Sequence, residues 1–183
     1  MSRLPNCPAG AIFLSVIGLL SFQQAQAAEG PGLVLRSWQQ ATDMAAWRGE
    51  GYWRAAVAPY APHFRYSEEH RPVVAVALER QRPDNWLAGF SLFNNSFGQP
   101  SAYAYVGRRH PGLLGQESLF FQWSAGILYG YVGKYKEKVA LNVGGFAPGA
   151  LVGLGWQFNR NAAATVHLLG DAGVMFQFSW DYR

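Results

Sequence analysis

The chain has 183 residues, of which 50% are hydrophobic and 15% aromatic, and a formal net charge of +4. So mild an excess of positive charge, scattered along the chain, does not indicate a nucleic-acid-binding protein. The one cysteine, Cys7, lies in an N-terminal apolar segment, so the rest of the chain can hold no disulfide and no cysteine-based metal or redox site. After that segment, no apolar run is long enough for a membrane-spanning helix.

The first residues have the pattern of a secretory signal peptide. Arg3 provides a positive charge, residues 9–22 form an apolar run, and the small residues Ala25 and Ala27 frame a cleavage site. The run is too short and too weakly flanked for a membrane anchor. We therefore expect export of the protein, with residues 1–27 removed by cleavage after Ala27.

Residues 28–52 are expected to form an N-terminal segment with one amphipathic helix. Between Leu33 and Arg48 the apolar residues fall near one side of a helix, and the glycines at 49 and 51 end the pattern. Such a helix would lie at a membrane interface beside a barrel. It would equally be an ordinary N-terminal helix, and both readings stay open.

From residue 53 to residue 183 the hydrophobic pattern has a period of two, which indicates β-strands. The last segment shows it most clearly, because apolar and aromatic residues at even positions 174–182 alternate with mostly polar ones. Turn signals such as residues 82–85 and 159–161 separate the segments. The eight predicted strands cover residues 53–66, 72–81, 86–95, 101–109, 119–131, 145–158, 162–169 and 173–182.

Eight strands of about ten residues match the smallest outer-membrane barrels. Within lipid all backbone polar groups must pair internally, and strands achieve this only in a closed sheet. The predicted fold is therefore all-β: an eight-stranded antiparallel transmembrane β-barrel, residues 53–183, with an N-terminal amphipathic helix. Its interior would be packed or hold one small ligand rather than a pore. A soluble lipocalin-like barrel is disfavoured, because its aromatic stripes would face water.

Candidate chemistry lies at one end of the predicted barrel. No metal-ligand spacing, G-x-S-x-G motif or phosphate-binding loop occurs, and we expect no metal and no cofactor. Residues 93–100 (FNNSFGQP) follow the third strand, although such residues are also ordinary turn formers. The topology brings Ser96 to the same end as His63 and His70. A hydroxyl beside an imidazole suits acyl transfer with histidine as the general base, whereas either histidine alone is also explained as a solvated loop residue.

Three prolines interrupt the predicted strands: Pro59 and Pro62 in the first and Pro148 in the sixth. Proline donates no hydrogen bond to a ladder, so it weakens strand pairing. In a membrane barrel such weak seams would admit a lipid chain sideways. Alternatively, each proline lies at a strand end, where it is tolerated.

This layout resembles the PagP family of outer-membrane lipid A palmitoyltransferases. Residues 93–96 (FNNS) resemble the family's Phe-x-Asp-Ser motif, and residues 60–66 (YAPHFRY) resemble the segment around its catalytic histidine. The resemblance implies catalytic roles for Ser96 and for His63, with His70 as a competitor. Asn95 replaces the family's aspartate, and an amide can orient an imidazole but cannot stabilise imidazolium by charge.

The resemblance also implies a hydrocarbon pocket with Gly107 at its floor, and lateral openings at Pro59 or Pro62 and at Pro148. The implied reaction moves a palmitoyl chain from a phospholipid to lipid A, with Ser96 as oxyanion donor or nucleophile. The implied protein is embedded in the outer membrane, binds no nucleic acid and is a monomer. Basic residues near the site would contact lipid A phosphates: Arg65, Arg71, Lys134, Lys136 and Lys138. Two alternatives remain, a lipid A deacylase-type esterase and a non-enzymatic small barrel.

Overall fold

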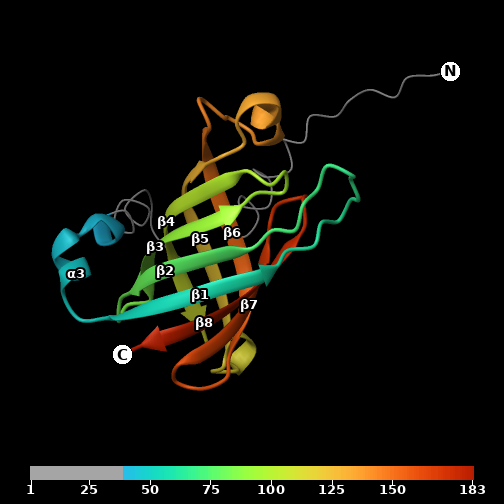
Figure 1. Ribbon diagram of the computed structural model, residues 1–183. Helices are drawn as coiled ribbons and strands as arrows, with labels where there is room; N and C mark the ends of the chain where they lie inside the picture. Colours follow the sequence, from blue (N-terminus) through green and yellow to red (C-terminus); the bar gives the residue numbers. More distant parts are fainter. Residues whose placement is uncertain (1–38) are drawn as a thin grey trace, which may run out of the picture. The chain divides into compact units, whose positions relative to one another are not determined.

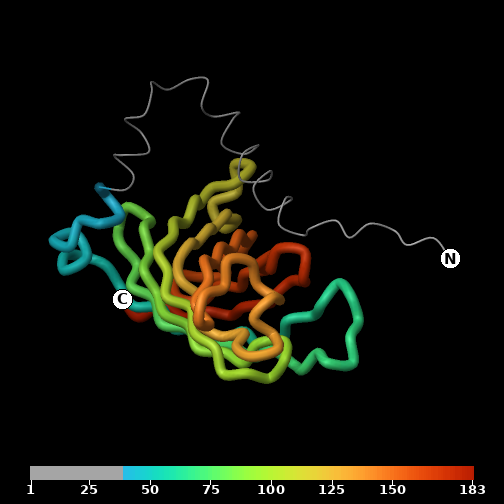
Figure 2. Tube along the Cα trace, turned by 90° about the horizontal axis from the view of Figure 1, so that it is seen from above, coloured from blue at the N-terminus to red at the C-terminus, as the bar shows by residue number. Residues whose placement is uncertain are grey.

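A computed structural model describes residues 39–183, so the predicted signal peptide and the start of the predicted N-terminal helix lie outside the described residues (Figure 1). Eight antiparallel strands pair in chain order and close into a barrel in which β8 meets β1, and Figure 2 shows them following one another around it. The predicted all-β barrel of eight antiparallel strands is confirmed. The strands are β1 (Tyr52–Tyr60), β2 (Ala75–Gln81), β3 (Trp86–Asn94), β4 (Pro100–Pro111), β5 (Leu119–Tyr129), β6 (Phe146–Gln157), β7 (Ala162–Leu168) and β8 (Val174–Tyr182).

The first strand is shorter than the sequence pattern predicted, because it ends at Tyr60 rather than at residue 66. Its register with β8 shifts between Val57 and Tyr60, around Pro59. Neither Pro59 nor Pro62 can donate to a ladder, so the alternating pattern continues in the sequence after the pairing has stopped. The second strand accordingly begins at residue 75, three residues later than expected.

The part of the predicted N-terminal helix that is described is not continuous. Residues 39–42 are helical, and α3 (Met44–Arg48) begins separately after Asp43. The Asp43 carboxylate accepts hydrogen bonds from the backbone N–H groups of Ala45 and Ala46, as an N-cap residue does. Within residues 39–183, no helix is both long enough and apolar enough to cross a membrane.

Side chains alternate between the outside and the interior of the barrel, and the apolar side faces outward. Large hydrophobic residues on every strand except β4 are exposed, whereas eleven buried polar or charged residues of the strands point inward, among them Arg54, Glu79, Gln122 and Asp181. This arrangement is inverted relative to a water-soluble protein and is typical of a barrel whose outer face contacts lipid. The outward group includes Trp53, Val57, Val76, Leu78, Phe90, Leu92, Ile127, Tyr129, Phe146, Leu154, Trp156, Val166, Leu168, Phe176, Phe178, Trp180 and Tyr182.

A buried ion cluster joins the first and last strands. Arg54 on β1 lies opposite Asp181 on β8 and opposite Glu79 on β2. Its Nε donates to Asp181 Oδ1 at 2.5 Å and its Nη2 to Oδ2 at 3.0 Å, while Nη1 lies 3.8 Å from Glu79 Oε2. A two-point contact between guanidinium and carboxylate fixes both the separation and the orientation of the strands that carry them. The cluster therefore clamps the closing seam of the barrel.

The connections differ at the two ends of the barrel. The connections of residues 82–85, 112–118 and 158–161 join strands at one end. Those of residues 61–74, 95–99, 130–145 and 169–173 join them at the other, which we call the long-loop end because it carries the two longest connections, 61–74 and 130–145. The 3₁₀ helix η3 (Gly133–Lys138) lies in the third of these segments and is drawn in orange in Figure 1.

We expect Arg54→Ala to lower the free energy of unfolding by about 3–5 kcal/mol, because Asp181 and Glu79 would remain as buried and unpaired charges. Arg183→Ala is the matched control. Arg183 also contacts Asp181, at 3.4 Å, but it is 52% exposed, so its loss should cost less than about 1 kcal/mol. Urea unfolding of the barrel in lipid vesicles would measure both values, and equal losses would show that the cluster does not clamp the seam.

Candidate functional site

The segment that follows β1 places His63 at the long-loop end, beside the start of β8. His63 pairs with Gly173 in an isolated β-bridge, the N–H of Phe64 donates to Ala172 O at 2.9 Å, and the N–H of Val174 donates to Pro62 O at 3.1 Å. A Cβ at Gly173 would lie 2.1 Å from Pro62 O, so only glycine allows this close approach. The imidazole is thus held by backbone pairing across the β1–β8 seam.

A tight turn after β3 presents Ser96. The N–H of Asn95 donates to Gln99 O at 2.9 Å and the N–H of Gly98 donates to Asn95 O at 2.8 Å, with Gly98 at φ 76°. The carbonyl of Ser96 accepts the N–H of Arg71 at 2.8 Å, which ties the turn to the preceding loop. The backbone on both sides of Ser96 is therefore fixed by hydrogen bonds.

The structure brings His63 and Ser96 together. Nε2 of His63 lies 2.6 Å from Oγ of Ser96, although the two residues are 33 positions apart in the chain. Burial lowers the pKa of His63, and the neighbouring His70 lowers it further. The imidazole is therefore neutral near pH 7, and Nε2 can accept a proton from a hydroxyl.

His70 lies beside this pair rather than in its place. Its ring stacks on that of His63, with centroids 4.1 Å apart, and contacts the edge of Phe97 at 5.7 Å. The geometry therefore selects His63 as the partner of Ser96. His70 packs against His63 and lowers the pKa of its imidazole by electrostatic repulsion.

Asn95 lies next to Ser96 in the sequence but its amide is turned into the loop. Oδ1 accepts the N–H groups of Phe97 and Gln99, both at 3.0 Å, and Nδ2 donates to Gln99 Oε1 at 3.2 Å. The side chain is 1% exposed. The sequence predicted that Asn95 could orient His63 by a hydrogen bond. The structure shows no such bond, because the amide of Asn95 bonds to Phe97 and Gln99 within the turn. Among the described residues, no carboxylate is hydrogen-bonded to His63, and Glu69 pairs with Lys134 at 3.7 Å.

Two residues beside the site were missed in the sequence. Gln99 joins the Ser96 turn to the backbone of Val132, and the ring of Tyr131 meets the edge of Phe97 in the same turn, with centroids 6.1 Å apart. Neither residue carries a periodic or motif signal, and both contacts join segments more than thirty residues apart. The only local sign is that Tyr131 follows a glycine at the end of a strand.

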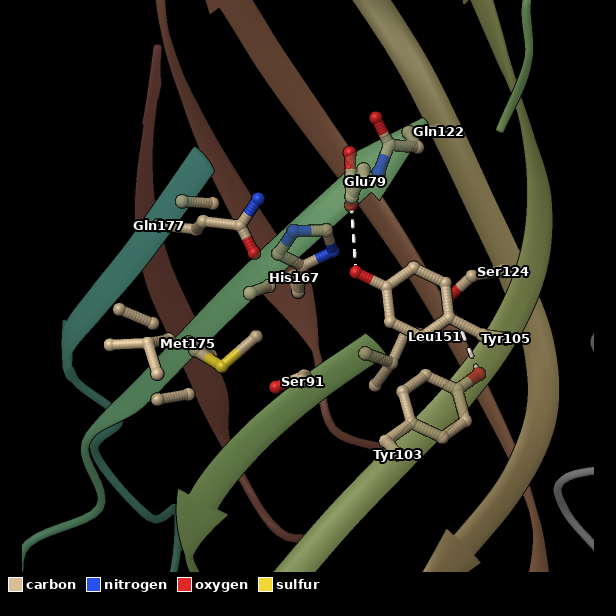
Figure 3. A pocket seen from close by; sticks show the side chains of 15 residues that line it. Glu79, Ser91, Tyr103, Tyr105, Gln122, Ser124, Leu151, His167, Met175 and Gln177 are labelled. Carbon is tan, nitrogen blue, oxygen red and sulfur yellow. Dashed lines mark hydrogen bonds between the residues drawn. The ribbon is translucent and has the colours of Figure 1, made fainter. Parts of the chain in front are cut away.

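Below this site the lumen contains a cavity of about 30 Å³, room for about two water molecules. Alanines from β1 and β2 form one wall: Ala56, Ala58, Ala75 and Ala77. Figure 3 shows the opposite side, where the rings of Tyr103 and Tyr105 stack with centroids 4.7 Å apart. Tyr105 Oη donates to Glu79 Oε1 at 2.8 Å and Tyr103 Oη donates to Gly149 O at 3.2 Å. The tyrosine pair forms a shelf below the site.

Gly107 does not line this cavity. A Cβ there would lie 2.2 Å from Trp123 O, so the glycine serves close approach of β4 to β5. The shelf instead depends on two other glycines, because a Cβ at Gly149 would lie 2.8 Å from the Tyr103 ring and one at Gly89 would lie 2.6 Å from the Tyr105 ring. The structure thus places the tyrosines between Gly107 and the His63–Ser96 pair.

The three prolines lie at or near the long-loop end. Pro59 falls at the register shift of β1, and Pro62 lies in the loop after that strand. Pro148 faces outward on β6, which pairs with β7 only over Val152–Gln157. Residues 146–151 of β6 pair with β5 on one side and extend past the last β7 pair on the other. This leaves a lateral break in the ladder beside Pro148.

Comparison with known proteins gives no family for this chain, because no family model and no curated protein matches it. In the part of the chain that the structure describes, no group of three or more His, Cys, Asp or Glu side chains is arranged to hold a metal ion. The chemistry of the site therefore has to be argued from its own residues.

We expect Asn95→Asp to leave the pKa of His63 unchanged, because the side chain at position 95 faces the Gln99 turn. The change should lower the free energy of unfolding by about 1–3 kcal/mol, since the donor to Gln99 Oε1 is lost in a buried place. Asn94→Asp is the control, as Asn94 makes comparable loop bonds at an exposed site. Titration of the His63 ring by NMR in detergent micelles would decide, and a clearly raised pKa in Asn95→Asp would show that position 95 acts on His63.

Proposed function

We propose that this protein is an outer-membrane acyltransferase that moves an acyl chain from a phospholipid to lipid A. The observation that carries the proposal is the 2.6 Å contact between His63 Nε2 and Ser96 Oγ. It lies at the long-loop end of a barrel whose outer face is apolar and whose interior is polar. A neutral imidazole against a hydroxyl is the minimal arrangement for acyl transfer by general base catalysis. The predicted signal peptide and the PagP-like segments around both residues support the same assignment.

The apolar outer face supports location in a membrane. Side chains such as Trp53, Phe90, Ile127 and Phe178 are each about half exposed, and residues of this kind lie on every strand except β4. Soluble monomers rarely expose so many large apolar side chains on neighbouring strands. A lipid bilayer is an environment in which such a face is stable, and the predicted signal peptide together with the fold supports export to the outer membrane.

The mechanism follows from the neutral state of His63. An acceptor hydroxyl of lipid A gives its proton to Nε2 as its oxygen attacks the ester carbonyl of the phospholipid. The ester bond to the glycerol breaks, a new ester to lipid A forms, and the leaving lysophospholipid oxygen takes the proton from His63. Ser96 either donates a hydrogen bond to the oxyanion or forms a transient acyl-serine by the same proton transfers, and both routes use the same pair.

The lateral break beside Pro148 supports a membrane-borne donor. Residues 146–151 of β6 lack a β7 ladder at the same level as the loops that carry the site. A phospholipid in the outer leaflet could bring its ester to His63 through such a break without leaving the bilayer. Lys134, Lys136 and Lys138 on η3 are placed at this end to attract the phosphates of either lipid.

The small lumen favours a second candidate, a lipid A deacylase-type esterase in which water replaces the acceptor hydroxyl. A cavity of about 30 Å³ does not hold a palmitoyl chain unless the Tyr103–Tyr105 shelf moves. An esterase needs no lumenal chain, because the acyl group can stay in the bilayer while its ester is cleaved. The two candidates differ in the product, since a transferase adds an acyl chain to lipid A and a deacylase removes one.

The deciding measurement is mass spectrometry of lipid A from cells that produce the protein or its variants. We expect a new species heavier by one palmitoyl chain with the unchanged protein, and its loss by at least about a hundredfold in His63→Ala and Ser96→Ala. Ser91→Ala is the control and should keep the product, because Ser91 is a lumenal serine on β3, the strand that precedes Ser96. A lighter lipid A would indicate the esterase, and unchanged lipid A would exclude both.

The transfer rate should fall as the pH drops through the pKa of His63, because the base must be neutral. That pKa is lowered by burial and by His70, so the acidic limb of the pH–rate profile should have its midpoint below the ordinary histidine pKa of 6.5. His70→Ala removes the neighbouring charge and should move the limb to higher pH while activity at pH 8 persists. A limb at the same pH in both proteins would show that His63 is not the titrating base, and loss of activity at pH 8 would make His70 the base instead.

A further inference from the structure

The outer face of the barrel carries a groove where β7, β8 and β1 lie side by side (Figure 1). Its volume is about 480 Å³, within the range of about 300–1,000 Å³ that is typical of ligand-binding clefts. We call it the β8 groove. Its outward-facing lining is entirely apolar and consists of Ala55, Val57, Phe158, Ala162, Phe178 and Trp180.

The register of the three strands produces this groove. Trp180 on β8 pairs with Ala55 on β1 and with Ala162 on β7. Directly opposed residues lie about 5 Å apart, so a large indole ring stands between two side chains that are single methyl groups. The surface is therefore hollow beside the ring, and its shape and apolar lining suit a slender alkyl chain.

The turn at one end of the β8 groove carries an exposed arginine. Phe158 and Ala162 both line the groove, and Arg160 lies between them in the chain. The N–H groups of Asn161 and Ala162 donate to Asn159 Oδ1 at 2.8 and 2.9 Å, which holds the turn in one conformation. A guanidinium group is thus fixed to the turn where the apolar lining ends.

Two more arginines lie at the same end of the barrel, opposite the long-loop end, which we call the turn end. Cζ of Arg183 lies 4.1 Å from the centre of the Tyr52 ring, and Cζ of Arg80 lies 5.7 Å from that of Trp53. Tyrosine and tryptophan are enriched at the level of the lipid headgroups. Among the described residues, the one carboxylate in contact with either of these two arginines is that of Asp181, which is buried.

We propose that the β8 groove binds an acyl chain of an anionic phospholipid whose phosphate contacts Arg160. The paired N–H donors of a guanidinium match two phosphate oxygens, and Arg80 and Arg183 attract the net negative charge of the headgroup. Outer-membrane barrels have their short turns on the periplasmic side, so this lipid belongs to the periplasmic leaflet. The site requires the membrane location proposed above but not the acyl-transfer reaction at the opposite end.

The charge is tested by native mass spectrometry of the barrel released from vesicles of equal parts phosphatidylglycerol and phosphatidylcholine with the same acyl chains. We expect the unchanged protein to retain one phosphatidylglycerol in preference to phosphatidylcholine. Arg160→Gln should reduce that preference by about fivefold, as expected for one arginine near a lipid phosphate. Arg108→Gln is the matched control and should keep the preference, because Arg108 lies near the turn end of β4, on the wall opposite β8.

The groove is tested by filling it. Ala162→Phe places a ring in the hollow beside Trp180 and should abolish the retention of lipid without changing any charge. Ala125→Phe is the control, because Ala125 is exposed on the outer face of β5 and does not line the groove. Urea unfolding in vesicles would check that all four variants are folded.

Equal loss of preference in Arg160→Gln and Arg108→Gln would overturn the proposal, as would unchanged lipid retention in Ala162→Phe. A lipid-free dimer would assign the groove to a second copy of the chain, and a lipid-free monomer would assign it to no lipid, so either also overturns it. Lipid retention needs no enzymatic activity. If lipid A stays unchanged in cells but the phosphatidylglycerol is retained, the proposed function fails and the lipid site stands.

Discussion

Pairing of β1 with β8 converts the sheet into a closed surface, and the Arg54–Asp181 contact lies on that seam. Taking three charges out of water is costly, and the cost is offset only because the guanidinium meets one carboxylate at two points and lies beside a second. Gln81 and Tyr105 complete the hydrogen bonding of Glu79. A polar network therefore occupies the half of the lumen away from the long-loop end, and the long-loop end is left for the chemistry that we propose.

The same closure determines how the site is supported. His63 is held across the seam by its bridge to Gly173, and Ser96 is held by a turn at the end of β3. The strands under both residues are fixed by ladders on either side, so the loops need only a few local bonds to bring imidazole and hydroxyl to 2.6 Å. The ladder between β6 and β7 is the exception, since it stops at Val152 and Leu168. The barrel thus combines a rigid base under the site with one weak wall beside it.

The barrel could be predicted because its strands obey a local rule. In β8 the residues from Val174 to Tyr182 alternate strictly, since one face meets the outside and the other the lumen, and the structure keeps that alternation. The end of β1 could not be predicted in the same way, because Pro59 and Pro62 stop the ladder while the hydrophobic pattern continues. A period of two records which face a side chain would occupy and says nothing about whether a backbone partner is present.

The site was predictable in part for a related reason. Topology alone brings His63 and Ser96 to one end, because both follow strands that finish there. Which histidine touches Ser96, and which way Asn95 turns, depend on loop contacts that no local pattern records. The bonds of Gln99 to Val132 depend on pairing between two loops, which leaves no sequence signature of its own.

The absence of a carboxylate bonded to His63, within the described residues, changes what the site can do. In a serine–histidine–aspartate triad the carboxylate orients the imidazole and stabilises the imidazolium that forms during the reaction. Here the ring is oriented by its backbone bridge and by stacking on His70, and His70 disfavours imidazolium by charge. Such a histidine is a ready acceptor at neutral pH but holds its proton weakly. In the acyl transfer that we propose, proton uptake by His63 and delivery to the leaving group would therefore have to be closely coupled, and stabilisation of the developing negative charge would fall to neutral donors such as the Ser96 hydroxyl.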